Sequence, residues 1–141
     1  MQTQYVFIAG GVGITPFRSM IKYLIDKNIS ASITLFYITR NKDEFIFKDL
    51  LDKANDQLNL KTIYVLSHAS AEWKGEKGDI DEAMISKYIK DVLSPIYFIS
   101  GPQAMVEAYR TMLQKMNINI VPKARRVALK DFFFDRTYGH T

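Results

Sequence analysis

The sequence predicts an α/β protein with a doubly wound, five-stranded parallel sheet of order 3-2-1-4-5 and helices on both faces. Five apolar, β-branched or aromatic runs alternate with segments of helical period, which is typical of this class. The first run, Val6 to Ala9, is almost continuously apolar, as expected for a strand that is buried on both faces. Two runs end in glycine turns, Gly10–Pro16 and Ser100–Pro102, and a helical pattern follows each of them.

The predicted strands are 6–9, 33–38, 62–66, 96–99 and a last one between Arg126 and Phe134. We expect Thr15 to cap the first helix with Pro16 in its first turn, and Asp79 or Asp81 to cap the third. The predicted helices each carry an apolar stripe, formed in turn by Phe17, Met20, Ile21, Leu24 and Ile25, by Phe47, Leu50, Leu51, Ala54 and Leu58, by Ile85, Tyr88, Ile89 and Val92, and by Met105, Tyr109, Met112, Leu113 and Met116. The only long loop runs from Ser67 to Asp79. A length of 141 residues fits one domain of ordinary size, so residues 1–141 are predicted to form one domain.

Composition excludes several classes of protein. With 48% hydrophobic residues the chain is not disordered, and no apolar run approaches the ~20 residues of a membrane span. The start lacks the features of a signal peptide, so we expect a soluble, cytoplasmic protein. The chain has no cysteine, and His68 and His140 lie far apart without acidic neighbours, so no metal site is expected.

The net charge of +4 is modest. Lys123, Arg125 and Arg126 form a small basic group that fits either an anionic ligand or a solvated loop. A nucleic-acid-binding protein would show a broader basic stripe interleaved with stacking aromatic residues. Nucleic acid is therefore not an expected partner.

The first glycine turn has the form of an anion-binding site. Glycines let a ligand approach the backbone, and the helix N-terminus offers free N–H groups and a positive dipole. The alternative is a tight turn without a ligand. With the strand order 3-2-1-4-5 both glycine turns lie side by side at the carboxyl edge of the sheet, where open sheets bind ligands. Two converging turns favour a nucleotide crevice.

Three common motifs do not fit the first turn. A Walker A sequence needs Gly-Lys-Ser/Thr, whereas Gly13 is followed by Ile14 and Thr15. The dinucleotide fingerprint needs a third glycine where Pro16 stands, and an acid at the end of the second strand. That strand ends in Thr39 and Arg40; an arginine there favours a 2′-phosphate, unless it pairs with Asp43 or Glu44. The Gly-x-Ser-x-Gly motif of hydrolases is absent.

These segments resemble the pyridine-nucleotide half of the ferredoxin–NADP reductase family. Gly10–Pro16 matches its first glycine motif, and Ser100–Pro102 with Met105 is similar to its Cys-Gly-Pro signature. The resemblance spans nearly the whole chain and includes two further segments: the loop with Trp73, Gly75 and Gly78, and the segment Arg40-Asn41 with Phe47, Leu50 and Leu51.

The resemblance implies an NAD(P)H-dependent flavin oxidoreductase. In this family NAD(P)H passes a hydride to FAD, which is bound mainly by a β-barrel domain that precedes the nucleotide domain. The flavin then passes electrons singly to an iron–sulfur or haem carrier. Because no flavin-contact motif is found here, we expect this chain to bind NADP or NAD and to be inactive without its flavin domain.

The family's roles carry over to matching residues. Gly10, Gly11 and Gly13 would bring the backbone to the pyrophosphate, Thr15 would donate to it or to the nicotinamide end, and Pro16 would fix the turn. Thr39 and Arg40 would meet the adenosine ribose or its 2′-phosphate, and the other wall would be Gly101, Pro102 and Met105. Ser100 stands in place of a cysteine near the nicotinamide and is the first catalytic candidate. Asp131 is the second, and Tyr138 a possible flavin cover, although Phe134–Arg136 departs from the family's C-terminal pattern.

Two other functions share this architecture. A non-catalytic nucleotide-binding or electron-transfer subunit could dock on a separate flavoprotein. A receiver-like or flavodoxin-like signalling domain is disfavoured, because Gly10 and Gly11 stand where a receiver has acidic residues.

Overall fold

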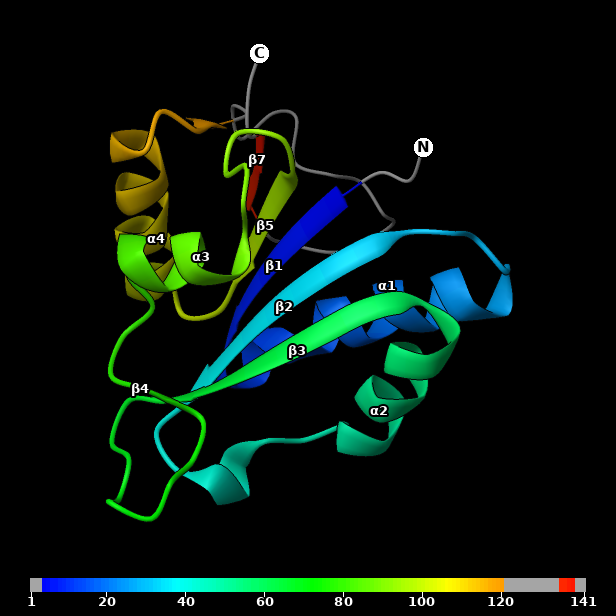
Figure 1. The fold of residues 1–141 in the computed structure, drawn as a ribbon, viewed down its shortest axis with the longest axis horizontal. Coiled ribbons are helices and arrows are strands. Elements are labelled where there is room, and N and C mark those ends of the chain that lie inside the picture. Colours follow the sequence, from blue (N-terminus) through cyan, green and yellow to red (C-terminus); the bar gives the residue numbers. More distant parts are fainter. Residues whose placement is uncertain (1–3, 121–134, 139–141) are drawn as a thin grey trace.

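The computed structural model describes residues 4–120 and 135–138, which build one seven-stranded sheet of order β4-β3-β2-β1-β5-β7-β6 (Figure 1). The strands are β1 (Gln4–Gly10), β2 (Ser32–Thr39), β3 (Asn59–Leu66), β4 (Glu76–Lys77), β5 (Ile96–Ser100), β6 (Asn119–Ile120) and β7 (Asp135–Tyr138). The α-helices are α1 (Ile14–Asp26), α2 (Lys48–Gln57), α3 (Glu82–Tyr88) and α4 (Gln103–Lys115), with short 3-10 helices η1 (Gly11–Gly13) and η2 (Lys42–Glu44).

The centre of the sheet confirms the predicted order. Strand β1 pairs in parallel with β2 on one side and with β5 on the other, so Ala9 lies beside both Tyr37 and Ser100. Strand β3 pairs in parallel with β2. The chain therefore winds outward from β1 in one direction through β2 and β3, and returns to its other side at β5. This reversal creates the switch point at the carboxyl ends of β1 and β5.

The fifth parallel strand is not beside β5, where the sequence predicts it. It is the two-residue β4, which pairs with the end of β3 at the opposite edge. Beside β5 lies β7, which is antiparallel to it, and β6 is antiparallel to β7 in turn. After α4 the chain thus enters β6, which runs in the same direction as β5. Strand β7 lies between β5 and β6. The predicted strand from Arg126 to Phe134 lies outside the described residues.

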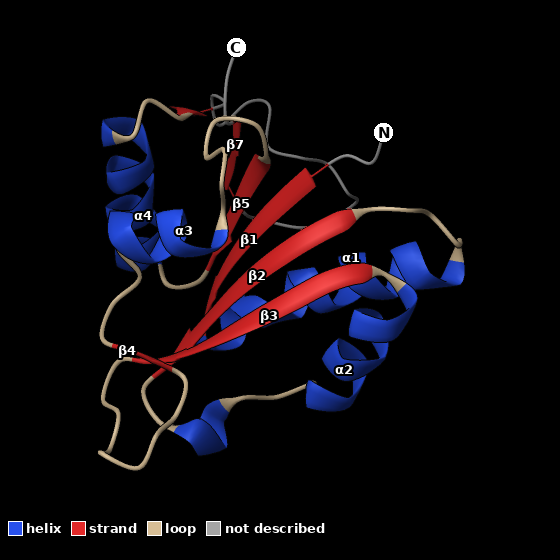
Figure 2. Ribbon diagram, viewed as in Figure 1, coloured by secondary structure: helices blue, strands red, loops and turns tan. Residues whose placement is uncertain are grey.

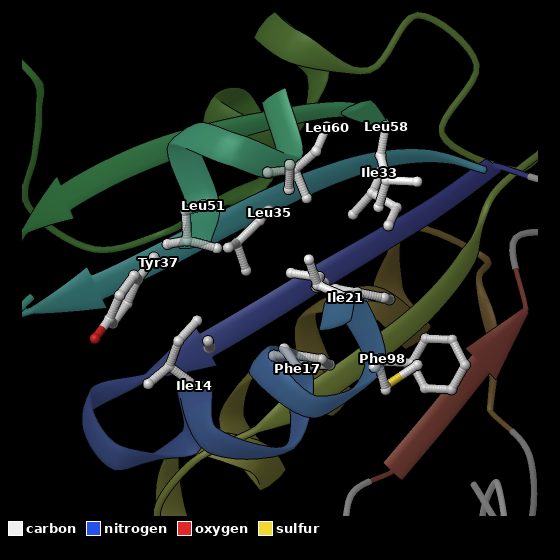
Figure 3. Packing of buried hydrophobic residues seen from close by; sticks show 14 of the residues in the cluster. Ile14, Phe17, Ile21, Ile33, Leu35, Tyr37, Leu51, Leu58, Leu60 and Phe98 are labelled. Atoms are coloured by element: carbon white, nitrogen blue, oxygen red, sulfur yellow. The ribbon is translucent and has the colours of Figure 1, made fainter. Parts of the chain in front are cut away.

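Helices cover both faces of the sheet, as predicted (Figure 2). Alternate residues of β1 point to opposite faces, so Phe7 packs with α1 and α2, whereas Val6 and Ile8 pack with α3 and α4. In Figure 3 the apolar stripe of α1 lies against β1, with Ile14, Phe17 and Ile21 turned toward the sheet. In the described part of the chain, no helix is both long and apolar enough to cross a membrane.

The helix starts differ in two places from the sequence prediction. Helix α1 begins at Ile14, immediately after η1, so Thr15 lies in its first turn and does not cap it; Pro16 is in that turn, as predicted. Asp81 caps α3 by accepting a hydrogen bond of 2.8 Å from the Met84 N–H. Asp79 instead accepts bonds from the Ile80 N–H and, at 2.6 Å, from the hydroxyl of buried Tyr109.

Replacement of Ile21 by alanine tests the packing of α1 on the sheet. Ile21 has no exposed surface, so Ile21→Ala should lower the free energy of unfolding by about 3 kcal/mol. Ile29 is 41% exposed, and Ile29→Ala should cost less than about 1 kcal/mol. Urea unfolding of both variants measures the difference; equal losses would contradict the assigned packing of α1.

Candidate functional site

The two glycine turns lie in contact at the carboxyl ends of β1 and β5. Gly10 is the last residue of β1, and Gly101 follows the last residue of β5. A Cβ built on Gly101 would lie 3.3 Å from the Gly10 carbonyl oxygen, so the two backbones almost touch. The sequence expectation that both turns meet at one edge is confirmed.

Two glycines make this close approach possible. A Cβ on Gly13 would overlap the Ser100 carbonyl group and would lie 2.7 Å from the Gly101 Cα. A Cβ on Gly10 would overlap the sulfur of Met105. A larger residue at Gly13 would therefore push the two turns apart, whereas one at Gly10 would displace the end of the Met105 side chain.

The third glycine of this turn, Gly11, has open space beside it. Gly11 has a φ of +54°, which L-residues other than glycine adopt at a cost, and no atom lies within 4 Å of the position of a Cβ. The neighbouring Val12 is 79% exposed. The helical segment starts here with η1, and the first N–H groups of a helix have no acceptor within it. This side of the turn is thus accessible and suited to an anion.

The residues after β5 form the other wall. Ser100 is 5% exposed, and its hydroxyl makes no hydrogen bond to the residues that the structure describes. Pro102 is exposed and precedes α4. The half-buried Met105 is brought to the same place, with its sulfur beside Gly10 and Gly101. The other catalytic candidate, Asp131, lies outside the described residues.

The end of β2 carries the next group of candidates. Thr39 is buried, and its hydroxyl donates to the Asn41 carbonyl oxygen at 2.9 Å, which leaves its own oxygen free to accept. Arg40 is exposed and forms no ion pair or hydrogen bond within the described part of the chain. Neither Asp43 nor Glu44 pairs with it; the Glu44 carboxylate accepts the Asn41 N–H at 2.9 Å. No described residue therefore competes with a ligand for the guanidinium group of Arg40.

A cleft of about 440 Å³ lies beside this strand end, within the size range of small-molecule sites. It separates η2 from the loop after β3. Its walls are formed by Asn41, Lys42, Asp43, Glu44, Leu66, His68, Ser70, Glu72 and Trp73. The sequence analysis did not predict this cleft. The tryptophan of the Trp-x-Gly-x-x-Gly loop could have indicated it, because a large aromatic side chain in a loop can line a cleft when other residues hold it in place.

Trp73 has that support. Its indole N–H donates to the Glu76 carbonyl oxygen at 2.9 Å, and its ring stacks on buried Phe45 with centroids 6.1 Å apart. The Ser67 N–H donates at 3.0 Å to the carbonyl oxygen of Thr39, which joins the loop to the end of β2. The loop wall is thereby fixed relative to Arg40.

The loop is also attached to α3 through Glu76. Its carboxylate accepts hydrogen bonds from the Lys87 ammonium, at 2.6 Å, and from the Tyr88 hydroxyl. These donors hold the pKa of the Glu76 carboxyl below its ordinary value. No group of three or more histidine, cysteine or acidic residues that could hold a metal ion occurs among the described residues. His68 is an exposed loop residue 3.0 Å from the Ser67 hydroxyl.

Comparison with known proteins identifies the family. Residues 7–111 match the family described as the oxidoreductase NAD-binding domain, a match that covers more than half of the chain. The chain belongs to this family. The resemblance to ferredoxin–NADP reductases is thereby confirmed, and the chain is an NAD(P)-binding domain of that group.

Relatives of this NAD-binding domain include reductases and electron-transfer components. NADH-cytochrome b5 reductase 1 of Emericella nidulans is 31% identical over 136 residues, which cover 90% of this chain and 43% of the relative. The anthranilate 1,2-dioxygenase electron transfer component of Acinetobacter baylyi is 30% identical over 114 residues, or 80% of this chain and 33% of the relative. The NAD-binding domain thus spans less than half the length of these curated relatives.

Solved structures share the fold. The cytochrome b5 reductase domain of the nitrate reductase of Ulva prolifera superimposes with a TM-score of 0.67 at 24% identity. The alignment covers 82% of this chain and 45% of that one. The parallel sheet and its flanking helices are therefore those of known reductase domains.

Two alanine substitutions test the contact between the turns. Gly13→Ala should destabilise the protein by about 3 kcal/mol, because the added Cβ would overlap backbone atoms of Ser100. Gly11→Ala meets no atom and should cost only about 1–2 kcal/mol, for its positive φ. Chemical unfolding measures both; a Gly11 variant as unstable as the Gly13 variant would contradict the contact.

The Glu76 carboxylate should make stability depend on pH. Since its pKa is lowered in the folded protein, its contribution is present above the unfolded value near 4.5 and is lost as the pH falls through the folded value. Glu76→Gln should therefore lower the melting temperature at pH 7, and its effect should shrink progressively as the pH falls below 4.5. Thermal unfolding across this range is the measurement, with exposed Glu82→Gln as the control.

Proposed function

We propose that this domain binds NADP or NAD across the two glycine turns and presents the nicotinamide to a flavin. The observation that carries the proposal is the contact between the turns, which leaves the Gly11 side open while Gly10 and Gly13 face the other wall. A pyrophosphate fits this arrangement because the start of the η1–α1 segment offers N–H groups to an accessible surface. Thr15, exposed in the first turn of α1, would donate to the same groups.

The other candidate residues would contact different parts of the nucleotide. Ser100, Gly101, Pro102 and Met105 would line the nicotinamide end, where the Ser100 hydroxyl has no partner among the described residues and could hydrogen-bond the ring substituent. Thr39 and Arg40 would contact the ribose of the adenosine. The cleft beside Trp73 would receive the adenine, since it adjoins η2 directly after Arg40. The catalytic roles of Ser100 and Asp131 remain predictions.

When bound, NAD(P)H supplies a hydride to FAD, from which electrons pass singly to an iron–sulfur or haem carrier. This chain's own residues bind and orient the nucleotide. We propose that the flavin is held by a β-barrel domain of the same protein. The second candidate is a nucleotide-binding subunit that docks on a separate flavoprotein. Co-purification of a separate flavin-containing polypeptide with the native protein would favour the subunit.

Nucleotide titration tests the proposal. Adding NADP⁺ or NAD⁺ should shift the backbone amide resonances of residues 11–15. It should also change the fluorescence of Trp73, the single tryptophan of the sequence, because it lines the proposed adenine cleft. Trp73→Phe is the control for the optical signal. If saturating nucleotide left the resonances of residues 11–15 in place, the proposed function would be wrong.

Arg40→Ala tests which nucleotide is preferred. A guanidinium group at the end of β2 with no partner among the described residues favours a 2′-phosphate through charge-assisted hydrogen bonds, so the variant should bind NADP⁺ about tenfold more weakly and NAD⁺ almost unchanged. Lys53→Ala, which removes an exposed cation from α2, is the matched control. Equal losses for NADP⁺ and NAD⁺ would mean that Arg40 does not recognise the 2′-phosphate. One of the relatives is named as an NADH enzyme, so this comparison is informative.

A further inference from the structure

Met105 lies at the point where the two glycine turns meet. A Cβ on Gly10 would overlap its sulfur and would lie 2.5 Å from its methyl carbon. A Cβ on Gly101 would lie 3.1 Å from the same sulfur. The thioether is therefore packed against backbone that has no side chain on either side. It contacts both turns at their junction.

Met105 is more exposed than the methionines of the core. The sequence contains no cysteine, so methionines supply all its sulfur. Met20, Met84 and Met116 are buried, with at most 8% of their surface exposed. Among the described methionines only Met105 and Met112 are partly exposed, and both lie on α4. Solvent access is the first requirement for methionine oxidation.

We propose that Met105 is a reversible oxidation site that controls nucleotide binding, an inference that rests on the proposed function of the turns. The oxidant is hydrogen peroxide. The sulfur donates an electron pair to one peroxide oxygen, the O–O bond breaks, and the products are methionine sulfoxide and one molecule of water. Methionine sulfoxide reductases reverse the change.

Oxidation at this position must disturb the turns. An S–O bond has about the length of a C–C bond, and the structure has no room for one added carbon between the sulfur and Gly10. A sulfoxide oxygen directed toward Gly10 would thus displace the Met105 side chain from its position against both turns. An oxygen directed elsewhere would place a strong hydrogen-bond acceptor at the apolar junction, where it competes for N–H groups.

Met112 provides the matched control. It lies two turns further along the same helix, is partly buried in the same way, and packs against the apolar cluster between α3, α4 and the sheet. No Cβ built on a glycine of either turn would come near it. Its oxidation should therefore leave nucleotide binding unchanged.

Peroxide treatment of the full chain, followed by tryptic mapping, tests the inference. Trypsin separates the two methionines, since Met105 lies in the peptide 91–110 and Met112 in the peptide 111–115. Oxidation of Met105 should weaken NADP⁺ binding by about tenfold and shift the amide resonances of Gly10 and Gly101. Treatment with methionine sulfoxide reductases A and B should restore both. The affinity of Met105→Leu should not respond to peroxide, whereas Met112→Leu should respond as the wild type does.

The outcomes separate this inference from the proposed function. If the untreated protein binds nucleotide and complete oxidation of Met105 leaves its affinity unchanged, the switch is wrong. The same holds if Met112→Leu abolishes the response to peroxide. If the untreated protein binds neither nucleotide, the proposed function fails; unchanged Gly10 and Gly101 resonances after oxidation would then also overturn the role of Met105 at the junction.

Discussion

The contact between the backbones of the two glycine turns is the constraint on which the site depends. Strand β1 pairs with both β2 and β5, and this pairing places Gly10 beside Gly101. Gly13 then lies directly against the Ser100 carbonyl group. Because the glycines have no side chains, the turn after β1 can contact the turn after β5 directly. In the same turn Gly11 has a positive φ and open space at the position of a Cβ.

Much of the fold could be predicted because a long apolar run indicates a strand that is buried on both faces of the sheet. The order of β3, β2, β1 and β5 follows from such runs, from short connections and from two glycine turns that need to meet. Strands β4 and β6 have two residues each, which is too short for any periodicity to be visible. The antiparallel position of β7 depends on how the chain returns after α4, and local sequence carries no record of that path.

The parts of the site in which one residue type has a fixed geometric role could be predicted from the sequence. The parts in which contacts with other residues determine the position or partner of a side chain were harder to predict. Thr15 has a side chain suited to a helix cap, but the N-cap of α1 is Gly13, the last residue of η1. Thr15 therefore lies in the first turn of the helix. Whether Arg40 pairs with Asp43 or Glu44 cannot be read from spacing alone. In the structure Arg40 pairs with neither of them, and Glu44 accepts hydrogen bonds from Asn41 instead. The cleft beside Trp73 combines segments from two loops and has no sequence signature of its own.

The central place of β1 has a consequence for when the site exists. Gly10 lies near the start of the chain, whereas its neighbour Gly101 follows β5, most of the chain later. The crevice therefore forms only after non-local pairing is complete, and partly folded chains that lack β5 have half a site. By linkage, a ligand that bridges both turns stabilises the docking of β5 and α4 on β1. Bound nucleotide should thus slow hydrogen exchange in β5 more than in β3, which belongs to only one side of the switch point.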